Sequence, residues 1–177
     1  MVHEIILAGF GGQGILSAGK LLAQAGMLDG KHVSWLPSYG PEMRGGTANS
    51  SVVVSEEPVD SPVLYSCNAL IAMNRPSLDR FEALVDAGGI IIVDSSIVDR
   101  NVSRDDIVSF RIPATRIASD IGNMAFANII LLGKLIAERN TVTVENFEKA
   151  LYEVLPEKKH HLIPEEMKAL HIGMEYS

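Results

Sequence analysis

The residues with the clearest chemical potential form a glycine-rich turn near the start of the chain. The short apolar run at 5–8 leads directly into the motif G-F-G-G-Q-G at 9–14. Apolar residues then recur over 15–28 at the spacing of a helix with one buried face. A strand, a G-x-G-x-x-G turn and a helix in this order can bind phosphate, because glycines let the backbone approach an anion and the free N–H groups at the helix start point toward it. We therefore expect a phosphorylated ligand here.

The surroundings of this turn narrow the class of ligand. A dinucleotide-binding fingerprint also carries Asp or Glu about twenty residues further on, where the acid holds the ribose hydroxyls. The corresponding region, S-W-L-P-S at 34–38, contains no acid, which argues against NAD. In a Walker-type loop a lysine adjoins the last glycine, whereas Lys20 lies six residues beyond Gly14. A tight turn that serves only helix–sheet packing is the alternative interpretation.

A second concentrated signal is the segment S-Y-G-P-E-M-R-G-G at 38–46, where glycines and a proline interrupt any periodic pattern. In an α/β sheet, the loops that leave the carboxyl ends of the strands gather at one edge. We therefore expect this loop beside the glycine turn, with Arg44 supplying a cation to phosphate that is held by backbone amides. The alternative is a surface ion pair between Arg44 and Glu42, which would contribute little.

The rest of the chain predicts alternating strands and helices. Strands are expected at 31–36, 47–55, 67–73, 90–93 and 108–112, and helices at 76–85, 114–121, 124–138 and 143–155. The β-branched run at 90–93 is typical of a central parallel strand, and the glycine pair at 88–89 is expected to end the preceding helix. Residues 156–177 are charged and short of core residues, which predicts a peripheral helix or an arm on a partner. The fold class is α/β, with residues 1–177 as a single domain.

Composition sets limits on the function. The 177 residues carry a formal net charge of −7, which opposes nonspecific binding to nucleic acid because that binding needs clustered Lys and Arg. No apolar run approaches the roughly 18 residues of a membrane span, and residues 1–7 include Glu4 and no basic start. We therefore expect neither a membrane anchor nor a signal peptide, and a cytoplasmic location.

The single cysteine, Cys67, rules out an internal disulfide. It also excludes a self-contained iron–sulfur cluster, which normally needs four thiolates, and the usual structural zinc sites, which need at least two. We interpret Cys67 as a small apolar packing residue.

Several other residues could have either a functional or a structural role. Asp94 follows the predicted central strand, where it could act on a ligand or cap the turn at 95–96. The aromatic residues could anchor an interface or be buried, and the asparagines could bind ligand or cap the helix predicted from 124. His160 and His161 are adjacent and would project in different directions from a helix, so we expect solvated side chains and no metal site there. These aromatic, asparagine and histidine residues are Trp35, Tyr39, Asn123, Asn128, His160 and His161.

Taken together, G-F-G-G-Q-G-I near the amino terminus and S-Y-G-P-E-M-R-G-G-T-A from 38 onward resemble the gamma subunit of the 2-oxoacid:ferredoxin oxidoreductases. The similarity extends to A-S-D-I-G-N-M at 118–124 and to residues 128–133, which resemble the A-x-x-x-G-N and N-x-x-x-x-G segments of that family. The resemblance implies a three-layer α/β/α sandwich of helices around a largely parallel, Rossmann-like sheet.

The resemblance also implies a function. Complexes of this family convert a 2-oxoacid such as pyruvate, 2-oxoglutarate, a branched-chain oxoacid or indolepyruvate, together with coenzyme A, to an acyl-CoA and carbon dioxide, and pass electrons to ferredoxin. The gamma subunit helps to bind coenzyme A and has no catalytic or metal-binding residues of its own, so the isolated chain would be inactive. By motif match, the residues expected to bind coenzyme A are Gly9, Gly11, Gly12, Gln13, Gly14, Glu42, Arg44, Gly45 and Gly46.

Under the same resemblance, thiamine diphosphate, magnesium and the iron–sulfur clusters belong to partner subunits. The expected partners are an alpha and a beta subunit, with a delta subunit in some complexes, and the chain would meet ferredoxin only indirectly. In isolation it could pair with a second copy of itself. Two alternatives are a free-standing Rossmann-like nucleotide-binding oxidoreductase and a purely structural assembly module whose glycine loops serve packing.

Overall fold

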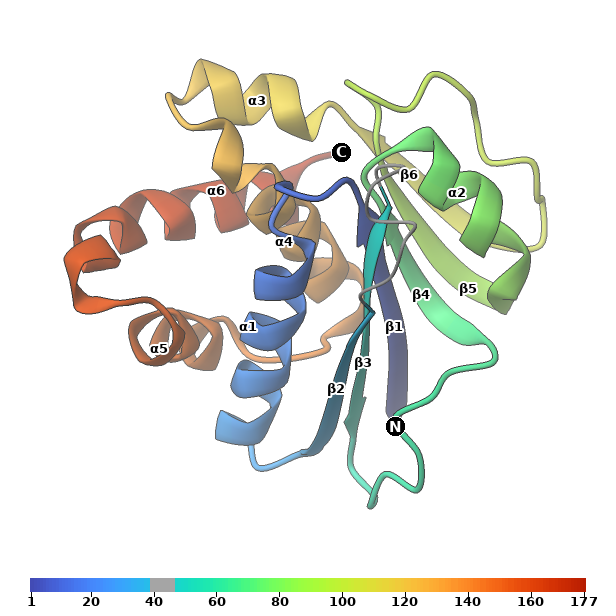
Figure 1. The fold of residues 1–177 in the computed structure, drawn as a ribbon, viewed down its shortest axis with the longest axis horizontal. Helices are drawn as coiled ribbons and strands as arrows, with labels where there is room; N and C mark the ends of the chain where they lie inside the picture. Colours follow the sequence, from blue (N-terminus) through green and yellow to red (C-terminus); the bar gives the residue numbers. More distant parts are fainter. Residues whose placement is uncertain (39–46) are drawn as a thin grey trace.

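The computed structural model describes residues 1–38 and 47–177, and these form a mixed α/β fold around one six-stranded sheet (Figure 1). The strand order is β2-β3-β1-β4-β5-β6. β1, β4, β5 and β6 run parallel, and β3 is antiparallel to its neighbours β1 and β2. The strands are β1 (Val2–Gly9), β2 (His32–Ser38), β3 (Ala48–Ser55), β4 (Cys67–Ala72), β5 (Val85–Asp94) and β6 (Val108–Ile112).

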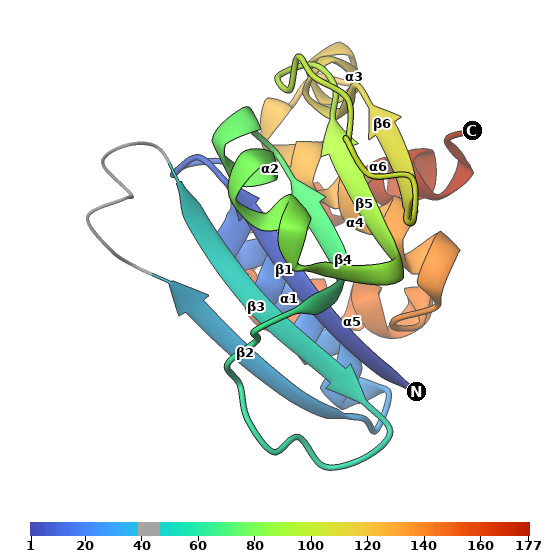
Figure 2. The same ribbon diagram turned by 90° about the vertical axis from the view of Figure 1, so that its right-hand side faces the viewer.

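The helices cover the sheet unevenly. α1, α4, α5 and α6 lie on one face and α2 lies on the other (Figure 1), and Figure 2 shows α2 in front of the sheet. This arrangement confirms the predicted sandwich around a largely parallel sheet. The helices are α1 (Ile15–Leu28), α2 (Arg75–Phe81), α3 (Ala114–Asp120), α4 (Ala127–Arg139), α5 (Val144–Val154) and α6 (Ile163–Glu175), with short 3-10 helices η2 (Glu82–Leu84), η3 (Met124–Phe126) and η4 (Glu157–Leu162). Within the described ranges, every helix is too short or too polar to cross a membrane.

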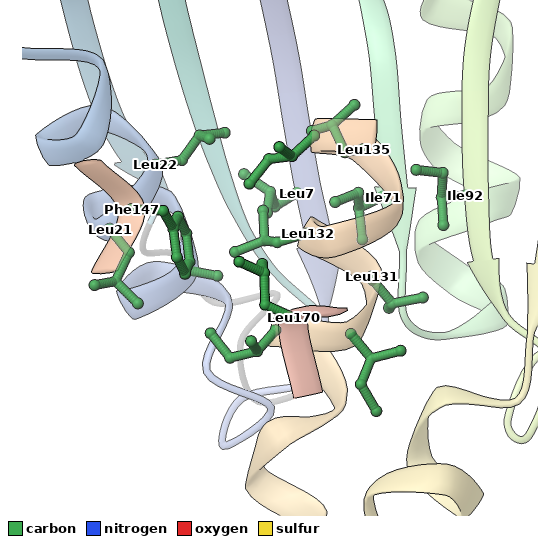
Figure 3. Packing of buried hydrophobic residues seen from close by; sticks show 14 of the residues in the cluster. Leu7, Leu21, Leu22, Ile71, Ile92, Leu131, Leu132, Leu135, Phe147 and Leu170 are labelled. Carbon is green, nitrogen blue, oxygen red and sulfur yellow. The ribbon is translucent and has the colours of Figure 1, made fainter. Parts of the chain in front are cut away.

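The core lies on both faces of the sheet. On the thicker side, Leu7 and Ile71 from the strands pack with Leu22, Leu132 and Phe147 from the helices (Figure 3). A smaller cluster lies beneath α2. Because the central strands are buried on both faces, they read as continuous apolar runs, as parallel strands do.

The glycine pair at 88–89 differs from its predicted role. The sequence indicates a helix to 85 that these glycines end, whereas α2 ends at Phe81 and β5 already begins at Val85. Val85 pairs with Cys67 of β4 across an irregularity in the register, and Gly88 has a φ of +79° with its N–H donated to Asp106 O at 2.7 Å. Pairing with a neighbouring strand therefore overrides the local turn signal.

The carboxy-terminal segment is helical, but it is not the peripheral tail that its charge predicts. α6 buries Ile163 and Leu170 in the main core and packs against α4. The contact is close, because a Cβ atom on Gly173 would overlap the carbonyl of Ile130. Glu165, Lys168 and Glu175 are exposed, although Glu166 is buried, and the apolar stripe between them is narrow, which is why average composition is misleading here.

Candidate functional site

The candidate site lies at the carboxyl edge of the sheet, where the parallel strands end. β1 ends at Gly9, β4 at Ala72 and β5 at Asp94, and the segment 10–14 leaves β1 at this edge and leads into α1 (Figure 1). Open α/β sheets bind ligands at this edge. The position therefore agrees with the predicted phosphate-binding role of the glycine turn.

The backbone of the turn needs glycine at two positions. Gly12 has a φ of +90° and Gly14 a φ of +74°, a region that other L-residues enter only with strain. Gly14 is the N-cap of α1, and no side chain caps this helix start in the described residues. The first N–H groups of a helix have no partner within the helix. They border a pocket of about 250 Å³ that the turn, the first residues of α1 and Ala48 enclose.

Gln13 holds the turn in place. Its Oε1 accepts the Phe10 N–H at 2.6 Å, and its Nε2 donates to Met73 O at 3.3 Å, just beyond the end of β4. A Cβ atom on Gly9 would lie 2.5 Å from Gln13 Oε1, so this position of the Gln13 side chain also requires glycine at position 9. Gln13 and Gly9 were predicted as ligand-binding residues, and the structure gives both a supporting role in shaping the turn.

The second asparagine of the 118–133 segment also reaches the turn. Asn128, in the first turn of α4, donates from Nδ2 to Gly14 O at 3.1 Å. Asn123 instead accepts the Ala125 N–H at 3.0 Å and caps η3. Of the two interpretations offered for these residues, the capping role holds for Asn123, and Asn128 links α4 to the start of α1.

A second pocket, of about 240 Å³, lies on the other side of the turn. Gly12 and Gln13 line it together with apolar side chains that include Met73, Ile97 and Met124. α4 begins beside this pocket at Ala127, directly after η3, and the Ala127 N–H donates to Met124 O. The positive ends of two helices therefore lie near the turn, and they favour an anion there despite the acidic composition of the chain.

The second predicted loop falls mostly outside the described residues. Tyr39, Glu42, Arg44, Gly45 and Gly46 all belong to that part of the chain. The strands on either side are described: Ala48 of β3 pairs with Gly9 of β1 and borders the pocket at the turn, and Ser38 of β2 pairs with Asn49. Both ends of the loop thus lie close to the glycine turn, as the sheet-edge argument predicts.

The other candidate residues have structural partners. Asp94 is buried and accepts hydrogen bonds from Ser96 N at 3.0 Å and from Thr115 Oγ1 at 2.5 Å, so it caps the turn after β5 and ties it to α3. Trp35 is half-buried and donates from Nε1 to Ser50 Oγ at 2.9 Å. These contacts account for both side chains without a ligand.

Cys67 agrees with its predicted packing role, whereas His160 is partly buried and not solvated as predicted. Cys67 is fully buried, and burial raises the pKa of its thiol to about 12. A ring nitrogen of His160 lies 2.9 Å from Leu155 O, and its ring packs against Tyr152. Across the described ranges, no three His, Cys, Asp or Glu side chains are grouped closely enough to hold a metal ion.

The fold and the uncapped glycine turn define an α/β protein with a candidate anion-binding site at the carboxyl edge of its sheet. Comparison with known proteins then places the chain within one family: it belongs to the pyruvate ferredoxin/flavodoxin oxidoreductase family, whose model matches residues 4–176. This result confirms the resemblance that the two sequence motifs carry.

Curated relatives are named as subunits of 2-oxoacid oxidoreductases. The chain is 40% identical over 159 residues to the 2-oxoglutarate synthase subunit KorC of Methanocaldococcus jannaschii, a match that covers 88% of this chain and 85% of that protein. It is 39% identical over 175 residues to the ketoisovalerate oxidoreductase subunit VorA of Methanothermobacter marburgensis. That match covers 98% of this chain, which spans only 36% of the length of VorA.

Solved structures share the fold. The gamma subunit of a keto/oxoacid ferredoxin oxidoreductase from Geobacter sulfurreducens superposes with a TM-score of 0.83 at 32% identity, and the match covers 98% of this chain and 96% of that one. The 2-oxoglutarate:ferredoxin oxidoreductase of Magnetococcus marinus, solved with 2-oxoglutarate, coenzyme A and succinyl-CoA bound, gives a TM-score of 0.86 at 21% identity. That match covers 97% of this chain and 30% of the other, and it supports the fold alone.

Proposed function

We propose that this chain is the gamma subunit of a 2-oxoacid:ferredoxin oxidoreductase and that its glycine turn helps to bind coenzyme A. The complex would convert a 2-oxoacid and coenzyme A to an acyl-CoA and carbon dioxide and pass electrons to ferredoxin. The observation that carries the proposal is the uncapped start of α1 behind Gly12 and Gly14, at the carboxyl edge of the sheet. Membership of the family supports the reaction class.

Coenzyme A suits this site because its phosphate groups are anionic. The Gln13 N–H already donates to Phe10 O, but the other backbone N–H groups at 11–15 would donate to phosphate oxygens, and the positive helix end would stabilise their charge. Arg44 would add a charge-assisted hydrogen bond from the neighbouring loop. Among the other motif residues, Gly11 would allow close approach of the phosphate, and Glu42, Gly45 and Gly46 would shape the loop around Arg44.

The chain would contribute position and no bond-making chemistry of its own. Holding the acceptor thiol near its reaction partner removes much of the entropic cost of their encounter. An iron–sulfur cluster does not fit this chain, because its one cysteine is buried and its thiol pKa is raised. We therefore assign the clusters to partner subunits, and the family resemblance assigns thiamine diphosphate and magnesium to them as well.

The partners proposed from the resemblance are alpha and beta subunits, with a delta subunit in some complexes, in the cytoplasm. Ferredoxin would bind those partners, and the isolated chain, a single domain over 1–177, could form a homodimer. The names of the relatives favour a subunit over a free-standing nucleotide-binding oxidoreductase. An assembly module without a ligand is separated from the main proposal by the experiment below.

Substitution of Gly12 by Ala in the assembled complex tests the proposal. A Cβ atom there meets no atom of the described residues within 4 Å, so it would project into the space proposed for the phosphate, and the positive φ adds strain. Gly30, at the far end of α1, offers a matched control, because it also has a positive φ, +77°, and a Cβ atom on it would likewise meet nothing within 4 Å in the described part of the chain.

We expect Gly12→Ala to weaken coenzyme A binding by about tenfold or more in calorimetry, while Gly30→Ala leaves it within twofold. Both variants should lose similar stability, on the order of 1 kcal/mol, because both place Ala in the left-handed region. Equal coenzyme A affinity in the two variants would favour the assembly module and overturn the proposed role of the turn.

A further inference from the structure

Asn128 connects two parts of the chain that are far apart in sequence. It lies in the first turn of α4, its side chain is nearly fully buried at 8% exposure, and its Nδ2 donates to Gly14 O, 114 residues away. Gly14 is the N-cap of α1 and has a left-handed backbone. One side chain therefore fixes the start of α1 relative to the start of α4.

This hydrogen bond is not needed to satisfy the Gly14 carbonyl. The same oxygen already accepts the Ala18 N–H at 2.9 Å, which is the first hydrogen bond of α1. The second donor restricts the direction of the carbonyl, and with it the peptide plane between Gly14 and Ile15. The fit is tight, because a Cβ atom on Gly14 would overlap Asn128 Nδ2.

The other polar atom of the Asn128 side chain, Oδ1, reduces the stability of the fold. This oxygen is buried and has no hydrogen-bond partner among the described residues. A buried carbonyl oxygen without a donor lowers stability. Leu has the same branching as Asn and carries no polar atom, so it would avoid that cost. The amide at this position therefore serves the geometry of the turn at some expense to stability.

We propose that Asn128 is a positioning residue for the glycine turn. By holding Gly14 O, it directs the first N–H groups of α1 into the pocket at the turn and keeps them ready for a phosphate group. This inference rests on the proposed function, since it assumes that the phosphate belongs to coenzyme A. It extends the site to α4, a helix that the glycine motif does not include.

The test compares Asn128→Leu with Thr141→Val in the assembled complex. Thr141 is a matched control, because it is also fully buried, its Oγ1 also has no partner among the described residues, and it lies beyond the opposite end of α4. Both substitutions remove a buried polar atom while keeping the branching of the side chain. If Asn128→Leu does not assemble, Asn128→Ala replaces it.

We expect Asn128→Leu to raise the KM for coenzyme A about three- to tenfold, while kcat at saturating coenzyme A stays within twofold. Hydrogen exchange in the peptide covering 9–17 should become several-fold faster, and the melting temperature should not fall. Thr141→Val should change neither the KM nor this exchange. A merely structural residue would instead lower the melting temperature and leave the ratio of kcat to KM as in the control.

The two readouts separate this inference from the proposed function. Unchanged exchange at 9–17 in Asn128→Leu overturns the positioning role, whatever the Gly12→Ala experiment gives. Faster exchange with an unchanged KM for coenzyme A supports the positioning role of Asn128 and contradicts the assignment of coenzyme A to this turn. A raised KM together with faster exchange supports both.

Discussion

The glycine turn and the ion-pair network behind α2 differ in whether their polar groups already have protein partners. At the glycine turn, the described groups are backbone amides and the neutral side chains of Gln13 and Asn128, and helix N–H groups are left without a protein cap. Behind α2, the carboxylate of Glu82 accepts the Ser103 N–H at 2.5 Å and an Arg100 nitrogen at 2.8 Å. Arg100 also binds Asp79 at 2.7 Å.

The difference separates a region with a structural role from the region that we propose binds a ligand. Burial by itself would raise the pKa of Glu82, but hydrogen bonds from Ser103 and Arg100 hold it below its usual value. The network therefore stays ionised, with the Arg100 guanidinium shared between the carboxylates of Glu82 and Asp79. It fixes the segment after β5, which carries Ile97 to the rim of the pocket beside the turn. The turn keeps its donors available for an anion.

The largest effect that this comparison predicts is on stability, and it lies in the network. Removing the Glu82 carboxylate leaves the Ser103 N–H and one Arg100 nitrogen without their acceptor, so Glu82→Ala should lower the free energy of unfolding by about 2–4 kcal/mol. Urea denaturation measures this loss. Coenzyme A binding by complexes that still assemble should stay within a few-fold, and a tenfold loss would show that the two regions are not separate.

Arg44→Ala tests the proposed binding region at the glycine turn. If the loop at 38–46 supplies the cation of the site, the variant should raise the KM for coenzyme A roughly tenfold, equivalent to about 1.4 kcal/mol. Its stability should change little. Arg80→Ala is the control, because it removes one positive charge from the exposed surface of α2. Similar KM values for both variants would remove Arg44 from the proposed site.

Acidification gives the smallest effect and distinguishes the regions by titration. The folded-state pKa of Glu82 is lowered, so the network contributes full stability above the ordinary pKa of 4.5 and loses it as the pH falls through the lowered value. We expect the free energy of unfolding to fall below about pH 4.5. The slope should be smaller in Glu82→Gln, and an unchanged slope would show that other carboxylates dominate.

Sequence reasoning worked best where structure is local. The helix predicted at 15–28 coincides with α1, because the apolar period is regular and the glycines before it mark the start. The glycine pair at 88–89 was misread, because strand pairing at Val85 decides its conformation. The tail was misread because the apolar stripe of α6 is narrow.

The site shows the same division. The glycines and Arg44 could be proposed from motifs, because a phosphate-binding loop is formed by a few residues that are adjacent in the sequence. The supports of the turn could not, because they depend on contacts across the fold. Gln13 reaches Met73 beyond β4, and Asn128 reaches Gly14 from α4, and no local pattern encodes either partner.

The most direct test is a structure of the assembled complex with coenzyme A bound. The account predicts phosphate oxygens at about 3 Å from backbone nitrogens of the segment 11–15, with Arg44 on the same phosphate group. Coenzyme A bound with its phosphates on a partner subunit, away from the start of α1, would contradict the account.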